Sequence, residues 1–213
     1  MKNAMKKVAL FATALILFGC ASDDEPEVVI SGASPTTTTK VNENGLPIAK
    51  EPTSITETML HTVVQMQVYH EGVEDVMQEA IDYMAEMETL LSTNVEGSDV
   101  YRINENAGIE PVEVQPETME IIKRSIQIAQ ESDGLFDISI GVLTDLWQIG
   151  SDDARVPEDS EITEAVNLID YEKISIDEDN LTVMLEEEGM SLELGGISKG
   201  YIGSGIVEIF EQN

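Results

Sequence analysis

The segment best suited to chemistry is Leu192-Glu193-Leu194-Gly195-Gly196-Ile197-Ser198-Lys199-Gly200-Tyr201, near the end of the chain. Two adjacent glycines let the backbone approach a ligand closely, and a helix that starts there points free N–H groups outward. Lys199 then falls in the first turn of that helix, where its ammonium group suits a phosphate. By itself the pattern is weak, because glycines before a helix more often make a tight turn and such a lysine is usually solvated.

A second candidate is Asp137, in the segment Ser132-Asp133-Gly134-Leu135-Phe136-Asp137-Ile138-Ser139. Its carboxylate could accept hydrogen bonds from a ligand, or it could cap a turn. Read in isolation, the segment favours the second role, an aspartate in a turn beside a core phenylalanine.

The chain's single cysteine, Cys20, ends an export signal. Lysines give a positive start, and residues 8–18 form an apolar run too short for a bilayer core, which needs about 20 residues. Leu17-Phe18-Gly19-Cys20 resembles a lipobox, so we expect cleavage before Cys20 and acylation of its thiol. Acyl chains on that thiol would hold the protein at the cell membrane, on its extracytoplasmic face. The alternative is an ordinary cleaved signal with an incidental cysteine.

Composition excludes several functional classes. The chain has 11 Lys and Arg against 42 Asp and Glu, a formal net charge of −31, which repels phosphate backbones, so no nucleic-acid partner is expected. An anionic ligand would need a local exception, such as a lysine, a helix N-terminus or a bound cation. One cysteine cannot form an internal disulfide, and two histidines without a nearby cysteine do not indicate a zinc site.

Hydrophobic periodicity predicts a mixture of strands and helices. Strands are expected at 62–69, at 136–146 (a short strand and a turn), at 173–176 and 182–185 (a hairpin) and at 190–194. Helices are expected at 73–91, 116–132, 157–168 and from the glycines at 195–196 to 209. Because strict βαβ alternation is absent, we expect an α+β fold, and an extracellular solute-binding lipoprotein is disfavoured.

The chain divides into three expected parts: a lipoprotein signal peptide at 1–19, a lipid-anchored flexible tether at 20–54 and a folded domain at 55–213. The tether is rich in proline, threonine and acidic residues and has few large apolar side chains. Such a segment buries too little surface to offset the entropy lost on ordering.

Taken together, the segments resemble the ApbE family, the FAD:protein FMN transferases once described as thiamine-biosynthesis lipoproteins. Five motifs carry the resemblance, in order: Leu60-His61-Thr62-Val63-Val64; Leu91-Ser92-Thr93 with Ser98 and Arg102-Ile103-Asn104; Gly134-Leu135-Phe136-Asp137; Leu146-Trp147 with Val156-Pro157; and Leu194-Gly195-Gly196-Ile197-Ser198-Lys199-Gly200-Tyr201. The resemblance implies an ApbE-like (T-fold-like) domain of mixed sheet and helix, of which 55–213 would be the N-terminal part.

The resemblance also implies the chemistry. Members move FMN from FAD to a threonine hydroxyl of an acceptor flavoprotein, with Mg²⁺, and release AMP; a metal and a lysine would neutralise the pyrophosphate oxygens. By position, seven residues would line the FAD site: Leu60, Asn94, Leu135, Phe136, Asp137, Glu193 and Lys199. The backbone carbonyl of Gly196 would be a Mg²⁺ ligand.

Several features depart from the family pattern. Asn94 stands where many members have a tyrosine, and Glu193 replaces the usual aspartate. Gly203-Ser204-Gly205 interrupts the last helix, where each glycine costs roughly 1 kcal/mol relative to alanine. The family's later motifs, with side-chain metal ligands and the expected base, have no counterpart, so no catalytic residue is assigned and the domain is expected to be incomplete. The alternative is a non-enzymatic flavin-binding or interaction lipoprotein.

Overall fold

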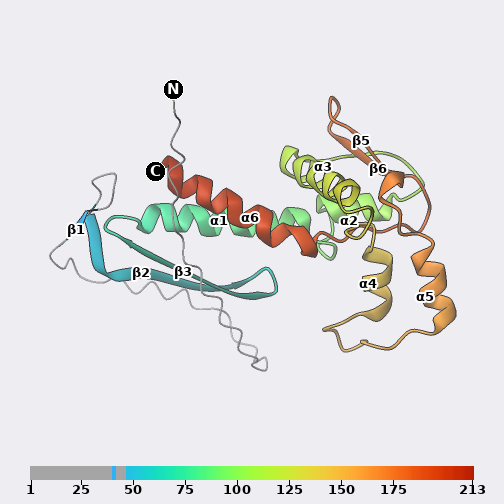
Figure 1. Cartoon of the computed structure of the whole chain (residues 1–213), viewed down its shortest axis with the longest axis horizontal. Helices are drawn as coiled ribbons and strands as arrows, with labels where there is room; N and C mark the ends of the chain where they lie inside the picture. The colour runs from blue at the N-terminus through green and yellow to red at the C-terminus, as the bar shows by residue number, and fades with distance from the viewer. Residues whose placement is uncertain (1–39, 42–46) are drawn as a thin grey trace.

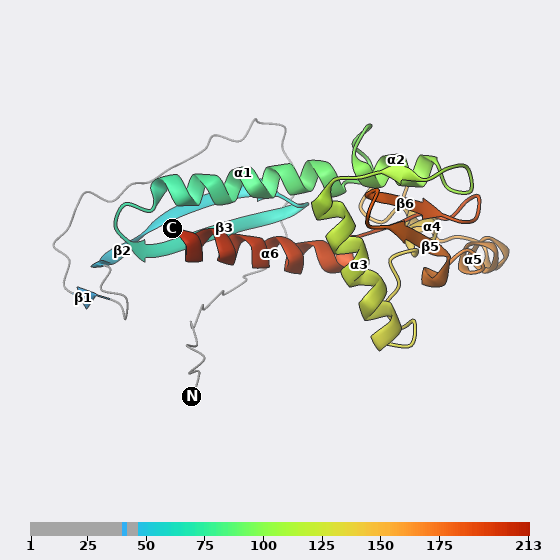
Figure 2. The same cartoon turned by 90° about the horizontal axis from the view of Figure 1, so that it is seen from above.

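The computed structural model describes residues 40–41 and 47–213. This part of the protein is elongated: two long helices lie along a β-hairpin at one end, and a rounder lobe forms the other end (Figures 1 and 2). The expected signal peptide, Cys20 and most of the expected tether lie outside the described residues. Among the helices that are described, none is long and apolar enough to cross a bilayer.

The described elements confirm the α+β class. In chain order they are β1 (Lys40–Val41), β2 (Pro47–Met59), β3 (Thr62–His70), α1 (Glu74–Leu91), α2 (Asp99–Glu105), β4 (Val112–Glu113), α3 (Pro116–Glu131), α4 (Gly141–Trp147), α5 (Asp159–Val166), a 3₁₀ turn η1 (Tyr171–Lys173), β5 (Ile174–Asp177), β6 (Thr182–Leu185) and α6 (Gly195–Gln212). Two three-stranded antiparallel sheets result, ordered β1-β2-β3 and β4-β6-β5.

A two-residue turn, Leu60-His61, joins β2 to β3. Both residues have positive φ, 53° and 55°, the combination that matches the twist of a tight hairpin but that glycine or asparagine usually supplies. The Leu60 N–H donates to the Glu88 Oε1 of α1 at 2.7 Å. Helix α1 therefore holds the tip of the hairpin.

The expected boundary of the tether at residue 54 is wrong, because β2 already begins at Pro47. The proline- and threonine-rich stretch becomes a strand since β3 supplies the ladder partners that local composition does not reveal. Pro52 falls in the irregular stretch between Ile48 and Thr53, where the register with β3 shifts. A proline, which lacks an N–H, is tolerated in a strand at such a bulge.

Helices α1 and α6 lie on the same side of the hairpin (Figure 1). The apolar period predicted for α1 is confirmed: its buried face includes Met84 and Met87, which form a small cluster with Ile202 of α6. Leu90 and Tyr201 pack against both this cluster and the larger core of the lobe. The two long helices thus connect the hairpin to the lobe.

The lobe encloses the larger core beneath the β4-β6-β5 sheet. The predicted helix at α3 and the predicted β5–β6 hairpin are both confirmed. Side chains fully buried here come from α2, α3, β6 and the segment before α6, namely Val100, Ile103, Ile121, Ile122, Val183, Leu185, Leu192 and Leu194.

Two predicted strands are absent from the described structure. Residues 136–140 form a turn because Asp137 Oδ1 accepts from the N–H of Ser139 at 2.8 Å, a local bond that competes with strand formation, and α4 follows at once. Residues 190–194 make only one isolated parallel bridge, Ser191 to Ile140. A continuous ladder does not form there.

Helix α6 runs unbroken through Gly203-Ser204-Gly205, and the two glycines have different surroundings. A Cβ added to Gly205 would lie 2.3 Å from the Tyr83 hydroxyl of α1, whereas one added to Gly203 would meet nothing within 4 Å. The absence of a side chain at Gly205 therefore lets α1 and α6 approach closely, while Gly203 only lowers helix propensity.

We predict opposite effects of alanine at these two glycines. Gly203→Ala should raise the free energy of unfolding by roughly 0.5–1 kcal/mol through helix propensity, whereas Gly205→Ala should lower it, since overpacking costs about 1–3 kcal/mol. Urea denaturation of both variants measures the difference. Equal stabilisation by both alanines would contradict the close packing of Tyr83.

Candidate functional site

A pocket lies where the tip of the β2–β3 hairpin, the end of α1 and the start of α6 meet. Its lining comes from these three places: Leu60, His61, Met87, Glu88, Leu91, Ser92, Thr93, Asn94, Glu193, Leu194, Gly195, Ser198, Lys199 and Ile202. The cavity holds about 110 Å³, less than the roughly 300–1,000 Å³ of sites that enclose a small molecule. It can therefore accommodate only part of a dinucleotide.

Four of the predicted site residues meet in this pocket: Leu60, Asn94, Glu193 and Lys199. They come from the hairpin turn, the loop after α1 and the two sides of the α6 N-terminus, so only the tertiary fold brings them together. Gly196, the predicted source of a carbonyl ligand, lies in the first turn of α6 between Glu193 and Lys199.

The other three predicted residues do not line the pocket. Leu135 is 93% exposed. Phe136 packs behind the first turn of α6, where a Cβ added to Gly196 would lie 3.3 Å from its ring. Both carboxylate oxygens of Asp137 hold the backbone: Oδ1 accepts from Ser139, and Oδ2 accepts from the N–H of Tyr171 at 2.9 Å. Of the two roles considered for Asp137, the structure thus shows the one in a turn. Contact of Leu135, Phe136 and Asp137 with FAD stays a prediction.

The start of α6 carries charges of both signs. Glu193 Oε1 accepts from the N–H of Gly195 at 2.6 Å, which satisfies one of the free donors at the positive end of the helix. Lys199 lies about one helical turn further on and also lines the pocket. The pocket therefore offers one ammonium group among the carboxylates of Glu88 and Glu193.

Asp145 of α4 lies close enough to Glu193 to feel its charge, and it was not identified from the sequence. Its pKa is raised mainly by burial, the hydrogen bond from Ser191 opposes the shift, and the charge of Glu193 adds to it. Ser191 Oγ lies 3.4 Å from Asp145 Oδ2. The one available signal was its place directly before the Leu146-Trp147 motif.

The described residues do not form a complete metal site. No group of three or more His, Cys, Asp or Glu side chains within residues 40–41 and 47–213 is placed to hold a metal ion. The carbonyl of Gly196 could offer its second lone pair beside its helical hydrogen bond, but one oxygen falls well short of the six that Mg²⁺ takes. Fit to Mg²⁺ is therefore not established by these residues.

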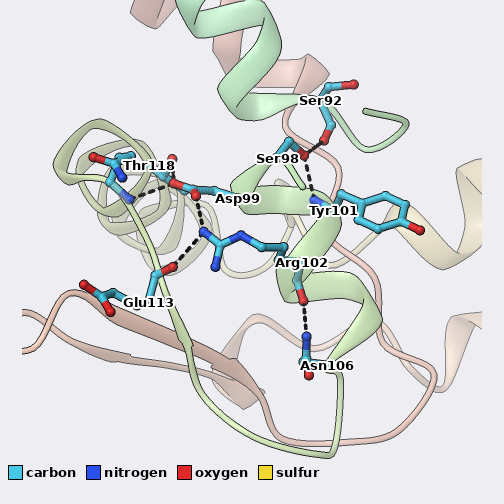
Figure 3. Close-up of polar contacts among 9 residues, drawn as sticks. Ser92, Ser98, Asp99, Tyr101, Arg102, Asn106, Glu113 and Thr118 are labelled. Atoms are coloured by element: carbon cyan, nitrogen blue, oxygen red, sulfur yellow. Dashed lines mark hydrogen bonds and ion pairs between the residues drawn. The ribbon is translucent and has the colours of Figure 1, made fainter. Parts of the chain in front are cut away.

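Helix α2 supports the loop that forms the rim of the pocket (Figure 3). At its N-terminus, Ser98 Oγ donates to the carbonyl of Ser92 at 2.5 Å and accepts from the N–H of Tyr101 at 3.0 Å. Ser92 Oγ in turn accepts from the N–H groups of Asn94 and Val95. The position of Asn94 thus depends on how α2 is fixed.

Asp99, at the first position of α2, fixes that helix in the lobe (Figure 3). It is only 2% exposed. Its Oδ1 accepts from Arg102, and its Oδ2 accepts from the N–H of Gln115 and from Thr118 Oγ1, both at 2.7 Å. One oxygen of this carboxylate therefore bonds within α2, and the other ties the start of α2 to the start of α3.

The fold and the pocket define a mixed α+β domain with a candidate ligand site at the N-terminus of its last helix. Residues 60–213 match the sequence profile of the ApbE family. The chain belongs to the ApbE family.

Relatives and solved structures agree with this assignment. The chain is 30% identical over 163 residues to an FAD:protein FMN transferase of Treponema pallidum (strain Nichols), which covers 72% of this chain and 45% of the relative. It is 34% identical over 125 residues to one of Klebsiella pneumoniae (strain 342), covering 59% and 40%. The ApbE protein of Thermotoga maritima superposes with a TM-score of 0.70 at 30% identity, covering 75% of this chain and 52% of that one.

The flavin transferase ApbE of Vibrio cholerae, with a TM-score of 0.69 at 20% identity over 76% of this chain and 54% of that one, shares the fold. The chain spans about half the length of the curated relatives it matches.

We predict that Asp99→Ala destabilises the protein by about 2–5 kcal/mol, because the buried hydroxyl of Thr118 and the N–H of Gln115 lose their acceptor. Urea denaturation measures the change. Asp152→Ala, an exposed aspartate in a loop, is the control and should stay within about 0.5 kcal/mol of the unchanged protein. Equal stability of the two variants would show that the Asp99 network is not needed.

Proposed function

We propose that this chain provides an FAD-binding part of an FAD:protein FMN transferase. The observation that carries the proposal is the pocket in which Leu60, Asn94, Glu193 and Lys199 converge, in a chain of the ApbE family. Relatives that bear this enzyme's name match over 72% and 59% of the chain.

The pocket chemistry supports binding of a dinucleotide phosphate. An ammonium group attracts phosphate oxygens, and Lys199 provides one at the start of α6. In the first turn of α6 the N–H groups of Gly195 and Ile197 are already bonded to Glu193 and to the Leu194 carbonyl, so the lysine is the main attraction for a phosphate. Glu193 is an acceptor when ionised, so it suits a hydroxyl or amino group of the ligand rather than its phosphates. The exposed Leu135 is available for an apolar contact outside the pocket.

The reaction we propose breaks the pyrophosphate bond of FAD. A threonine hydroxyl of an acceptor flavoprotein attacks the phosphorus of the FMN half, gives up its proton and forms a phosphoester, while AMP leaves. Mg²⁺ would neutralise charge on the pyrophosphate oxygens. Because the described residues offer only the Gly196 carbonyl, we assign no step to the metal and no residue as the base.

A second candidate is a lipoprotein that binds flavin or a partner without transferring FMN. The observation that favours it is the lack, within the described residues, of a group of side chains that could hold a metal. Release of AMP from bound FAD in the presence of Mg²⁺ and a flavoprotein acceptor would exclude this candidate.

We predict that the full chain quenches the fluorescence of FAD saturably. Lys199→Ala should weaken FAD binding by about tenfold or more, because an interaction with a charged group is worth roughly 1.5–3 kcal/mol. Lys123→Ala is the matched control, since that lysine lies on α3 and pairs with Glu178 outside the pocket. A folded chain that does not bind FAD, or equal binding by both variants, would refute the proposed site.

We further propose that the protein is lipid-anchored through Cys20 on the extracytoplasmic face of the cell membrane. Metabolic labelling with a palmitate analogue should mark the unchanged chain and leave Cys20→Ala unmarked, because the thiol is the acylated group. Ser22→Ala, two residues further on, should label normally. Label retained in Cys20→Ala would rule out this anchor.

A further inference from the structure

Asn104, at the C-terminal end of α2, makes two hydrogen bonds to one residue far along the chain. Its Nδ2 donates to the carbonyl of Leu192 at 3.1 Å, and its Oδ1 accepts from the N–H of Leu192 at 2.7 Å. A planar carboxamide has one donor side and one acceptor side, as a peptide unit does. The side chain therefore pairs with Leu192 in the way a neighbouring strand would.

Among the described residues, Asn104 is the one side chain that pairs with both backbone groups of Leu192. On the opposite side of the segment, the carbonyl of Ser191 accepts from the N–H of Gly141 at 3.0 Å, and the N–H of Glu193 donates to the carbonyl of Ile138 at 2.8 Å. Residues 190–194 belong to no sheet. Besides these bonds and the Asn104 pair, the segment is held by the bond from the Met190 N–H to the Glu187 carbonyl at 3.3 Å and by the Ser191–Asp145 contact. Burial of Leu192 and Leu194 in the core adds packing on one face of the segment.

The path of this segment sets the position of the pocket wall. Glu193 directly follows Leu192 and lines the pocket, and α6, which carries Lys199, begins two residues later at Gly195. A shift or rotation at Leu192 would therefore move the carboxylate and the helix N-terminus together. Displacement of ligand-binding groups by about 1 Å can cost about a hundredfold in function.

We propose that Asn104 is a positioning residue for the FAD-binding pocket. It acts through Leu192 and does not line the cavity itself. Helix α2 thereby holds two of the three parts of the pocket: Ser98 at its N-terminus holds the Ser92 loop, and Asn104 at its C-terminal end holds the segment that leads into α6. The inference rests on the proposed function, since its readout is FAD binding.

The test compares Asn104→Ala with Asn106→Ala in the full chain. Asn106 is a matched control because it has the same side chain, lies two residues away and uses its Nδ2 only for a local bond to the Arg102 carbonyl at 2.7 Å. Fluorescence titration gives the dissociation constant for FAD, and thermal unfolding gives the fraction folded at the titration temperature.

We expect Asn104→Ala to weaken FAD binding by roughly tenfold to a hundredfold at equal fraction folded, in line with the loss of partners that orient ligand-binding groups. Asn106→Ala should bind FAD as the unchanged chain does. Asn104→Asp keeps the acceptor for the Leu192 N–H but opposes a second oxygen to the Leu192 carbonyl, so it should also bind weakly; it serves if the alanine variant does not fold.

Two outcomes separate this inference from the proposed function. If the unchanged, folded chain does not bind FAD, the proposed function fails and the inference fails with it. If the unchanged chain binds FAD and a folded Asn104 variant binds equally well, Asn104 has only a structural role, and the proposed function stands.

Discussion

The buried carboxylate of Asp99 is the constraint on which the rest of the site depends. An ionised carboxylate inside a core is costly unless its oxygens are well paired. Here Arg102, the Gln115 N–H and the Thr118 hydroxyl satisfy it, and in doing so they lock the start of α2 to the start of α3. Because α2 is short, this lock fixes both of its ends, and with them the loop at Ser92 and the extended segment at Leu192.

The pocket thus forms where the ends of several secondary-structure elements meet, and not within a single layer of the fold. A hairpin turn, the loop after α1 and the N-terminus of α6 each contribute one part. Glu88 links the turn to α1 through its bond from the Leu60 N–H. This bond supports Leu60 and His61, two non-glycine residues with positive φ, a backbone conformation that is strained unless its surroundings hold it. Groups held in this way can be placed accurately only if the helices behind them are fixed, and the methionine-rich cluster between α1 and α6 provides that fixation.

The charges lining the pocket differ from the net charge of the chain, because they include the positive Lys199. A chain with a net charge of −31 repels anions at long range, although salt screens this repulsion beyond roughly 10 Å. Close to the start of α6, the helix N-terminus and Lys199 oppose the general field, while Glu193 satisfies part of the helix terminus itself. An anionic ligand would therefore be recognised at short range.

Local signals predicted several elements, and the family motifs could be read in their order along the chain. The apolar period of α1, the proline that opens α3 and the β5–β6 hairpin all lie in contiguous stretches, so they could be predicted. The family resemblance also marked, by position, four residues that line the pocket. The sequence already favoured the turn at Asp137, whereas the strand at residues 47–54 and the pairing of residues 190–194 with a side chain instead of a sheet became visible only in the fold. These last two outcomes depend on partners outside the segment itself, as with Asn104 and Leu192, which are 88 residues apart, and such partners leave no periodic pattern in the sequence.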